Sequence, residues 1–388
     1  MRPVLVLIFH AAALPDAGPL VRALAEARRA LADRQRGAFL AAGADAAEVV
    51  SGPPDGLPFG ERLAAELRVR GGAAFGATAG ATAGATAGAT PGATAGTTPG
   101  PGGVIVMGSG SIPLAQAADL RRFVEVAAGP GGHALANSRF SADVVAISRA
   151  ADLAGLPPLP ADNALPRWLE ERAGVAVADL RSRWRLGVDV DTPLDLIVLR
   201  DPAAGTLLAT APLIGERLAV LTEVMSNRRA ELLVAGRVSA ATLRWLERGV
   251  ACRVRALVEE RGLRAASRLA QSGGDGAPTD TRPPSSVLGE LLDRDGSDAL
   301  AAGVAKLAAA AVIDSRVLMA HRHGADESAW PAPEDRFASD LLLPARIADP
   351  WLRALTVSAS PAPIILGGHT LVNGGLRLLA SRARAGTR

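Results

Sequence analysis

Short, continuous apolar runs open the chain and recur along its first half. Residues 4–9 read Val-Leu-Val-Leu-Ile-Phe, which is typical of a strand buried on both faces of a parallel sheet. Apolar residues then recur at helical spacing over 18–42, and Gly43 follows as a C-terminal cap. Weaker patterns predict a strand at 48–50 and a short helix at 61–69.

The same alternation resumes at residue 104. Apolar runs predict strands at 104–107, 134–136, 144–147 and 186–190, and amphipathic stretches predict helices at 114–128, 163–172 and 193–199. Strands that alternate with helices indicate an α/β fold. We therefore expect residues 1–205 to form one Rossmann-like domain, with a mostly parallel sheet and helices on both faces.

Residues 206–388 carry a second set of alternating patterns. Helices are predicted at 207–225, 240–248, 288–292, 297–310 and 371–381, and strands at 230–234, 252–257, 311–313, 317–320 and 363–366. We expect a second, smaller α/β domain, whose family the pattern does not indicate.

Two segments lack the apolar side chains that a packed element needs. Residues 76–103 repeat Gly-Ala-Thr units and end in a run of glycine and proline, so they cannot repay the entropy of ordering. We expect this segment to be a disordered loop inserted in the first domain. The polar segment 271–286 is expected to be a flexible loop of the second.

The composition and charge of the chain indicate whether it binds nucleic acid. The formal net charge is only +3, and Lys306 is the only lysine, so the high isoelectric point reflects arginine usage. Arginines and acidic residues are interspersed, and aromatic residues make up 3% of the chain. Nucleic-acid binders gather basic charge on one face, often with aromatic residues between. We therefore expect no nucleic-acid partner.

Cysteine and hydropathy patterns favour a cytoplasmic protein without a membrane partner. Cys252 is the only cysteine, which rules out an intramolecular disulfide and fits a reducing compartment. The apolar run at 4–9 is short and leads into a charged helix, so a first strand is favoured over a signal peptide. No apolar run approaches the roughly 18 residues of a membrane span. The oligomeric state is not indicated.

Polar residues follow two of the predicted strands. Ser109, Gly110 and Ser111 come after the strand at 104–107, and Asp189 and Asp191 belong to the strand at 186–190 and its end. In open α/β sheets, ligands bind outside the carboxyl ends of the strands. Amides of the Ser-Gly-Ser turn could hold a phosphate, and the two carboxylates could hold Mg²⁺.

Each of these elements also has a simpler interpretation. The residues at 109–111 form a turn between a strand and a helix, and such a turn needs no ligand. Asp191 or Thr192 before Pro193 is a good helix start. The capping interpretation does not explain Asp189, which we place on the strand.

Two segments resemble a known group of nucleotidyltransferases. Residues 104–114 read VIVMGSGSIPL, and residues 186–196 read LGVDVDTPLDL. Together they are similar to the central strand-turn and the closing D-x-D-T-P-x-D-L element of enzymes with a nucleotide-diphospho-sugar transferase fold. The nearest members are the 2-phospholactate and phosphoenolpyruvate guanylyltransferases, and the molybdenum-cofactor guanylyl- and cytidylyltransferases are more distant. The resemblance covers the first half of the chain.

The resemblance implies transfer of a nucleotidyl group from a nucleoside triphosphate to a small phosphorylated acceptor. It implies Mg²⁺ as cofactor with Asp189 as a ligand, and a nucleotide or small-molecule substrate. The segment around Asn137, Arg139 and Asp143 also looks like that family's substrate neighbourhood. A plain polar connection between strands is the alternative for these three residues.

The chain departs from the family at two places. Residues 10–18 stand where the family carries a glycine-rich loop with arginine and lysine, yet they contain one glycine and no basic residue other than His10. Gly110 stands where the family usually has its second metal-binding aspartate. The second hypothesis is therefore a non-catalytic protein that binds a nucleotide or metabolite, or a regulatory protein, and that retains the fold.

A third hypothesis places the activity in the second domain. His321 and His323 follow the strand predicted at 317–320, and histidines two apart on an extended chain would share a face. Because Glu334, Asp335, Asp340 and His369 come later, a metal site is conceivable. The glycine-rich turn at 367–375 could hold an anion. His10 ends the first strand, where a lone histidine is more often structural. Cys252 has no evident activating partner.

Overall fold

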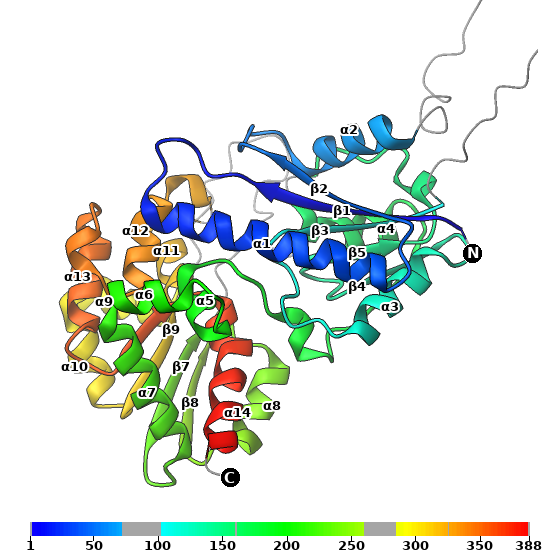
Figure 1. Cartoon of the computed structure of the whole chain (residues 1–388). Coiled ribbons are helices and arrows are strands. Elements are labelled where there is room, and N and C mark those ends of the chain that lie inside the picture. Colours follow the sequence, from blue (N-terminus) through cyan, green and yellow to red (C-terminus); the bar gives the residue numbers. More distant parts are fainter. Residues whose placement is uncertain (1, 72–101, 160, 260–284, 325, 387–388) are drawn as a thin grey trace, which may run out of the picture. The chain divides into compact units, whose positions relative to one another are not determined.

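The structure is a computed structural model that describes residues 2–71, 102–159, 161–259, 285–324 and 326–386 (Figure 1). The loops expected at 76–103 and 271–286 lie almost wholly outside the described residues. Contacts between Cα atoms divide the chain into two compact units. Unit 1 comprises Met1–Leu14 and Arg28–Gly187, and unit 2 comprises Pro15–Ala27 and Val188–Arg388.

Unit 1 is built on a six-stranded sheet with the order β2-β1-β3-β5-β4-β6. The strands are β1 (Val4–Ala11), β2 (Ala46–Gly52), β3 (Gly103–Gly108), β4 (His133–Ala136), β5 (Val144–Ile147) and β6 (Ala176–Asp179). The first three strands run parallel, whereas β5 is antiparallel to both of its neighbours, so the sheet is mixed. The expected α/β class is confirmed.

Helices cover both faces of this sheet because its central strands β1, β3 and β5 carry buried apolar side chains on both faces. The helices are α1 (Pro19–Ala41), α2 (Phe59–Gly71), α3 (Ala117–Ala127) and α4 (Leu165–Glu171), with 3₁₀ turns at Ala150–Leu153, Asp162–Ala164 and Trp184–Gly187. Even-numbered residues of β1 pack in a core with α1 and α3, and odd-numbered residues pack in a second core with α2 and α4. This alternation is the period of two that a strand imposes.

Unit 2 is built on a four-stranded sheet with the order β10-β9-β7-β8. The strands are β7 (Glu231–Gly236), β8 (Arg253–Val258), β9 (Ala310–Asp314) and β10 (Ile364–Gly367). All neighbouring pairs are parallel. The carboxyl ends of these strands therefore share one edge of the sheet, and the loops that follow them gather there.

Ten α-helices of unit 2 lie in the part of the chain that the structure describes. They are α5 (Pro193–Leu199), α6 (Ala204–Thr210), α7 (Pro212–Ser226), α8 (Ala240–Gly249), α9 (Val287–Asp295), α10 (Leu300–Ala305), α11 (Ser315–His323), α12 (Pro333–Asp340), α13 (Pro350–Ala359) and α14 (Leu376–Gly386). Short 3₁₀ turns lie at Ser297–Ala299, Glu327–Ala329 and Pro344–Arg346, and a π-helical turn lies at Leu371–Gly375. Helix α7 packs against β7, β9 and β10, and α12 and α13 pack against β10.

Several sequence-based elements differ in the structure. The strand predicted at 317–320 is part of α11, because its apolar residues are buried on a helix. The helix predicted at 207–225 is two helices, α6 and α7, bent by 106° before Pro212, which has no amide hydrogen to continue the first helix. The helix predicted at 297–310 is reduced to a 3₁₀ turn and α10, and it ends before β9. Among the described residues, no single helix has the length and apolarity of a membrane span, and only the bent pair α6–α7 reaches them together.

The division between units also differs from the boundary expected at residue 205. Helix α5 contacts α6, α12 and the π-helical turn, so the segment from Val188 groups with unit 2. The start of α1 groups there too, because the Glu334 carboxylate of α12 accepts hydrogen bonds from the amides of Leu20 and Val21 at 3.1–3.2 Å. A carboxylate at a helix N-terminus satisfies amides that have no partner within the helix.

Candidate metal centre

Asp189 and Asp191 lie on a short extended segment that leads into α5. The strand expected at 186–190 does not form, since Leu186 and Gly187 end a 3₁₀ turn and only Asp189 makes an isolated β-bridge. The pattern resembles a strand because Val188 and Val190, on either side of Asp189, are both buried, at 1% and 3% exposure. Both aspartates belong to unit 2, not to the sheet of unit 1.

A capping box fixes the start of α5, and Thr192 rather than Asp191 is its N-cap residue. The Thr192 hydroxyl accepts a hydrogen bond from the Asp195 amide. The Asp195 carboxylate in turn accepts from the amides of Asp191 and Thr192, at 3.0 and 2.8 Å. Reciprocal bonds of this kind hold the first turn of a helix. The capping interpretation thus applies to Thr192, and the backbone of Asp191 is held in place by Asp195.

His369 meets both aspartates from the loop after β10. Its Nε2 lies 3.4 Å from one Asp189 carboxylate oxygen, and its Nδ1 lies 3.9 Å from one Asp191 oxygen. Ligand atoms of the three side chains lie within 4.8 Å of one another, so the group could hold a metal ion. The Thr370 hydroxyl donates to the Asp189 carboxylate and orients it. Among the residues that the structure describes, this is the one cluster of three such side chains.

Exposure rises across the cluster, from 11% for the Asp189 side chain to 31% for His369 and 46% for Asp191. One side of the group is therefore packed in protein and the other faces solvent. A catalytic metal needs this arrangement, because protein ligands must leave positions for water and substrate.

The interaction between Asp189 and His369 dominates the electrostatics of the cluster. Burial alone would raise the pKa of the Asp189 carboxyl, but the charge and hydrogen bond of His369 outweigh burial and hold it well below its usual value. Burial would likewise lower the pKa of His369, and Asp189 raises it instead. Burial, together with the charges of Asp189 and Asp191, raises the pKa of Asp195 to about 8. Two carboxylates thus contact one imidazole, and the Asp195 carboxyl lies close enough to feel the charge of both.

An orphaned oxygen fits the same interpretation. Asp195 is 1% exposed, and its Oδ1 is buried without a hydrogen-bond partner among the described residues. A buried polar atom without a partner costs free energy and calls for an explanation. A cation bound by Asp189 and Asp191 would lessen the repulsion that adds to burial in raising the pKa of Asp195.

The loops after β7 and β9 border the cluster at the same edge of the sheet. Asp314 ends β9 and is fully buried, and Arg237, which follows β7, binds it through two nitrogens at 2.6 and 3.0 Å. The Asn373 amide of the π-helical turn donates to the carbonyl oxygens of both Arg237 and His369, each at 2.9 Å. A π-helical turn is rare and is frequently found at functional sites.

Candidates of the sequence that lie in unit 1 have partners within that unit. The amide of Ser109 donates to the Phe9 carbonyl and that of Ser111 to the Gly108 carbonyl, so both amides are used within the chain. Gly110 lies between them and offers no carboxylate. Ile112, which follows, has a φ of 44°, a strained conformation for a β-branched residue. The phosphate site at this turn stays a prediction.

The polar residues of the β4–β5 connection hold one another. The Asn137 side chain accepts from the Asp143 amide at 2.9 Å and donates to the Asp143 carboxylate at 2.8 Å and to the Leu186 carbonyl. Arg139 forms an ion pair with Glu170. These bonds shape the connection itself, so substrate contacts by the three predicted residues stay a prediction.

His10 also has a partner in unit 1. Its Nδ1 lies 3.1 Å from the Ser109 hydroxyl, and both residues are buried, at the carboxyl ends of β1 and β3. Burial and the nearby charges of Arg29 and Arg28 lower the pKa of His10, so its ring is neutral at physiological pH.

The other histidines and the cysteine do not join the cluster. His321 and His323 lie on α11, where residues two apart point in different directions, so the expected shared face is absent. His321 accepts from the Ser286 amide at 3.0 Å and faces Asp293 at 3.1 Å, and His323 packs edge-on against Trp351. Burial raises the pKa of the Cys252 thiol, which leaves it unreactive.

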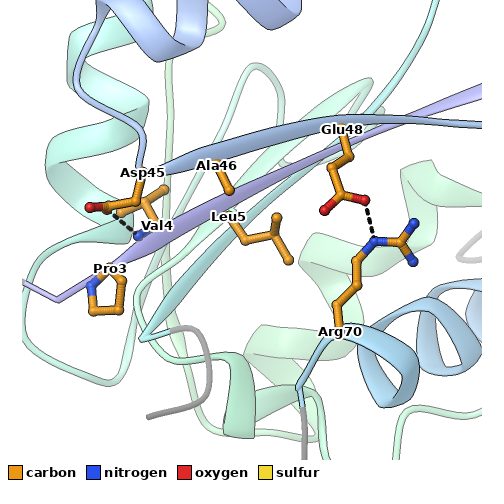
Figure 2. Close-up of a pocket in the computed structure, with 7 residues that line it drawn as sticks. All are labelled: Pro3, Val4, Leu5, Asp45, Ala46, Glu48 and Arg70. Atoms are coloured by element: carbon orange, nitrogen blue, oxygen red, sulfur yellow. Dashed lines mark hydrogen bonds and ion pairs between the residues drawn. The ribbon is translucent and has the colours of Figure 1, made fainter. Parts of the chain in front are cut away.

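A pocket of about 280 Å³ lies in unit 1, at the amino ends of β1 and β2 (Figure 2). Its polar groups pair among themselves, since Arg70 binds Glu48 at 2.6 Å and the Val4 amide donates to Asp45 at 2.7 Å. Ligands of open α/β sheets bind at the opposite, carboxyl ends of the strands. We therefore assign this pocket no chemistry.

Three residues of the site are not candidates in the sequence, namely Arg237, Asp314 and Asp195, whereas Asn373 lies in the glycine-rich turn at 367–375. Two of them carry a signal, because Asp314 and Arg237 end or follow apolar strands, where ligand-binding residues gather. The contact between Asp189 and Thr370 spans 181 residues, and no local pattern indicates it. Comparison with protein-family models, with curated proteins and with solved structures gave no match.

Proposed function

We propose that this protein is a divalent-metal-dependent enzyme, a transferase or hydrolase of a small molecule, whose metal is held by Asp189, Asp191 and His369. The observation that carries the proposal is the meeting of these three ligands within 4.8 Å. They lie next to the carboxyl edge of a parallel sheet, which is the usual place of an active site in α/β proteins. The excess of carboxylates around one imidazole supports a cation there.

The donor set bears on the identity of the metal. Mg²⁺ is the ion that the sequence resemblance implies, but Mg²⁺ prefers oxygen ligands and several waters. A set with one imidazole and two carboxylates suits Mn²⁺ or Zn²⁺ better. Such an ion would polarise a substrate oxygen and lower the pKa of a bound water.

Residues that are not ligands themselves orient the ligands of the site. Thr370 fixes one carboxylate by its hydroxyl, and Asp195 fixes the backbone before α5 through two amides. Groups that orient metal ligands in this way commonly affect metal affinity by tenfold or more. Nucleotidyl transfer is the narrower form of the proposal. The D-x-D-T-P motif supports it, and Gly110 and the occupied amides of the 109–111 turn do not.

Metal uptake by the full chain tests the proposal. The protein is stripped with a chelator, and Mn²⁺ binding is then measured by water-proton relaxation and elemental analysis. We expect a single saturable equivalent, lost in Asp189→Asn and in His369→Ala. The variants His321→Ala and Asp293→Asn are matched controls, because they remove a histidine–aspartate pair of the same unit that lacks a third ligand.

Thermal unfolding gives a second readout of the same binding. A ligand that binds only the folded state adds about 2.7 kcal/mol at a hundred times its Kd. For a domain of this size the gain raises the Tm by several degrees, of order 5 °C. Absence of saturable binding of Mn²⁺ and Zn²⁺ by the wild type would refute the proposal, and so would equal binding by Asp189→Asn.

A further inference from the structure

Arg237 is held rigidly at the carboxyl edge of the unit 2 sheet. Its Nε and Nη2 donate to the two carboxylate oxygens of Asp314, a planar and bidentate pairing. Gly236 before it has a φ of 120°, and a Cβ at that position would lie 2.3 Å from the Asp314 Cβ. Glycine is therefore required for the close approach of β7 to Asp314, and this approach places Arg237.

The same residue adjoins the candidate metal centre. One side-chain amide, that of Asn373, donates to the carbonyl oxygens of Arg237 and of His369, each at 2.9 Å. The loop that carries Arg237 and the loop that carries a metal ligand are thus joined by a single group. Although burial lowers the pKa of Arg237, the charges of Asp314 and then Asp191 raise it above its ordinary value, as expected for a cation in this field.

The pairing of Arg237 leaves part of its guanidinium unused. Among the described residues no partner binds its Nη1, and 15% of the side chain is exposed. A buried ion pair seldom stabilises a fold more than an apolar pair of the same shape would. The Asp314 carboxylate caps α11 by accepting from the Arg316 amide at 3.2 Å, and it also holds the Arg237 guanidinium in a fixed orientation at the edge where the metal ligands meet.

Resting on the proposed metal-dependent function, we propose that Arg237 binds an oxyanion group of the substrate, a phosphate or a carboxylate, next to the metal. A guanidinium matches both groups in shape and charge, and a cation beside a metal ion is a recurring way to hold transferred or hydrolysed anions. The substrate is then an anionic small molecule. Arg237 is the residue that selects it, whereas Asp189, Asp191 and His369 select the metal.

Two small anions test this assignment on the Mn²⁺-loaded full chain. Inorganic phosphate is followed by ³¹P line broadening and acetate by ¹H line broadening, because Mn²⁺ broadens only nuclei held close to it. We expect one of the two anions to show saturable broadening, and the anion that does so identifies the source of the oxyanion. Arg237→Lys keeps the positive charge but loses the planar guanidinium that can donate two parallel hydrogen bonds, so its anion affinity should fall by about tenfold.

A double variant covers the case in which a single substitution unfolds the site. Arg237→Gln with Asp314→Asn removes both charges of the pair together, so neither is left buried alone. It should retain Mn²⁺ binding and lose the anion. Arg294→Gln, an exposed arginine on α9, is the control for loss of a positive charge. If Mn²⁺ binds and the anion affinity is equal in the wild type and the double variant, the proposed role of Arg237 is refuted, but the proposed metal-dependent function is not. Absence of broadening for both anions does the same, and absence of Mn²⁺ binding overturns the proposed function with it.

Discussion

Loss of Arg316 should destabilise unit 2 more than any exposed substitution. Arg316 on α11 is 7% exposed, and Asp340 on α12 is fully buried. The guanidinium donates to both oxygens of the Asp340 carboxylate, one of them at 2.7 Å, and also to the Ser315 hydroxyl at 3.0 Å. Arg316→Met fills the same volume but leaves the Asp340 carboxylate buried without a cation.

The expected cost follows from that burial. Removal of one partner of a buried ion pair costs about 3–5 kcal/mol, whereas replacement of both partners by apolar residues is often neutral. Burial already raises the pKa of Asp340 in the wild type. The positive charge of Arg316 is the main effect that lowers this pKa. In the variant the carboxyl should take up a proton more readily. The free energy lost is therefore smaller at acid pH than at neutral pH.

Urea unfolding measures this cost if the signal comes from unit 2. Two of the five tryptophans, Trp168 and Trp184, belong to unit 1. In a background with both changed to phenylalanine, fluorescence reports on Trp245, Trp330 and Trp351 of unit 2. Arg316→Met should lose about 3–5 kcal/mol and Arg316→Met with Asp340→Leu should recover most of it. A loss below about 1 kcal/mol, or a double variant as unstable as the single one, would refute the reasoning.

Three further substitutions test other parts of the fold. Gly236→Ala should destabilise unit 2 by more than about 1 kcal/mol in urea, because of its φ of 120° and its contact with Asp314. Gly303→Ala on α10, where a Cβ meets open space, should not, and equal effects would contradict the argument. Asn373→Ala should weaken Mn²⁺ binding while the urea midpoint changes little, and an unchanged Mn²⁺ affinity would show that the turn does not position the site. For His10, burial first and then nearby arginines lower the folded-state pKa below 6.5, so stability present above that pH is lost as pH falls through it. His10→Gln should therefore lose less stability than wild type between about pH 7 and about pH 5, and parallel losses would refute this.

The sequence indicates the fold class and single ligands better than it indicates their assembly. Buried strands such as β1 and β3 are visible because a run of large apolar residues has few other uses. Helix α11 is misjudged because it is buried on all sides, and periodicity cannot separate such a helix from a strand. The strand β6 escapes notice because only one of its four residues, Val177, is buried, so it has no apolar run.

The metal ligands show the same limit. Asp189 and Asp191 are recognisable from a local motif, and His369 from a glycine-rich turn after a strand. Their meeting depends on the fold of unit 2, which brings the turn after β10 next to Asp189, so that Thr370 contacts a residue 181 positions earlier in the chain. The motif also suggested that Asp189 belongs with the first sheet, whereas the packing of α5 places it with the second. Local sequence patterns can therefore indicate single ligands, but the fold determines which of these ligands lie close enough to bind the same ion.

Helix α1 has a practical consequence for anyone who divides this protein into fragments. Its first turns group with unit 2 and the remainder with unit 1, and Glu334 holds its start. A fragment that begins at Val188 therefore lacks the segment Pro15–Ala27 and leaves the Glu334 carboxylate without these two amides. No single cut of the chain releases unit 2 whole. Its isolation calls for a rearranged chain, in which residues 15–27 are rejoined to it by a linker.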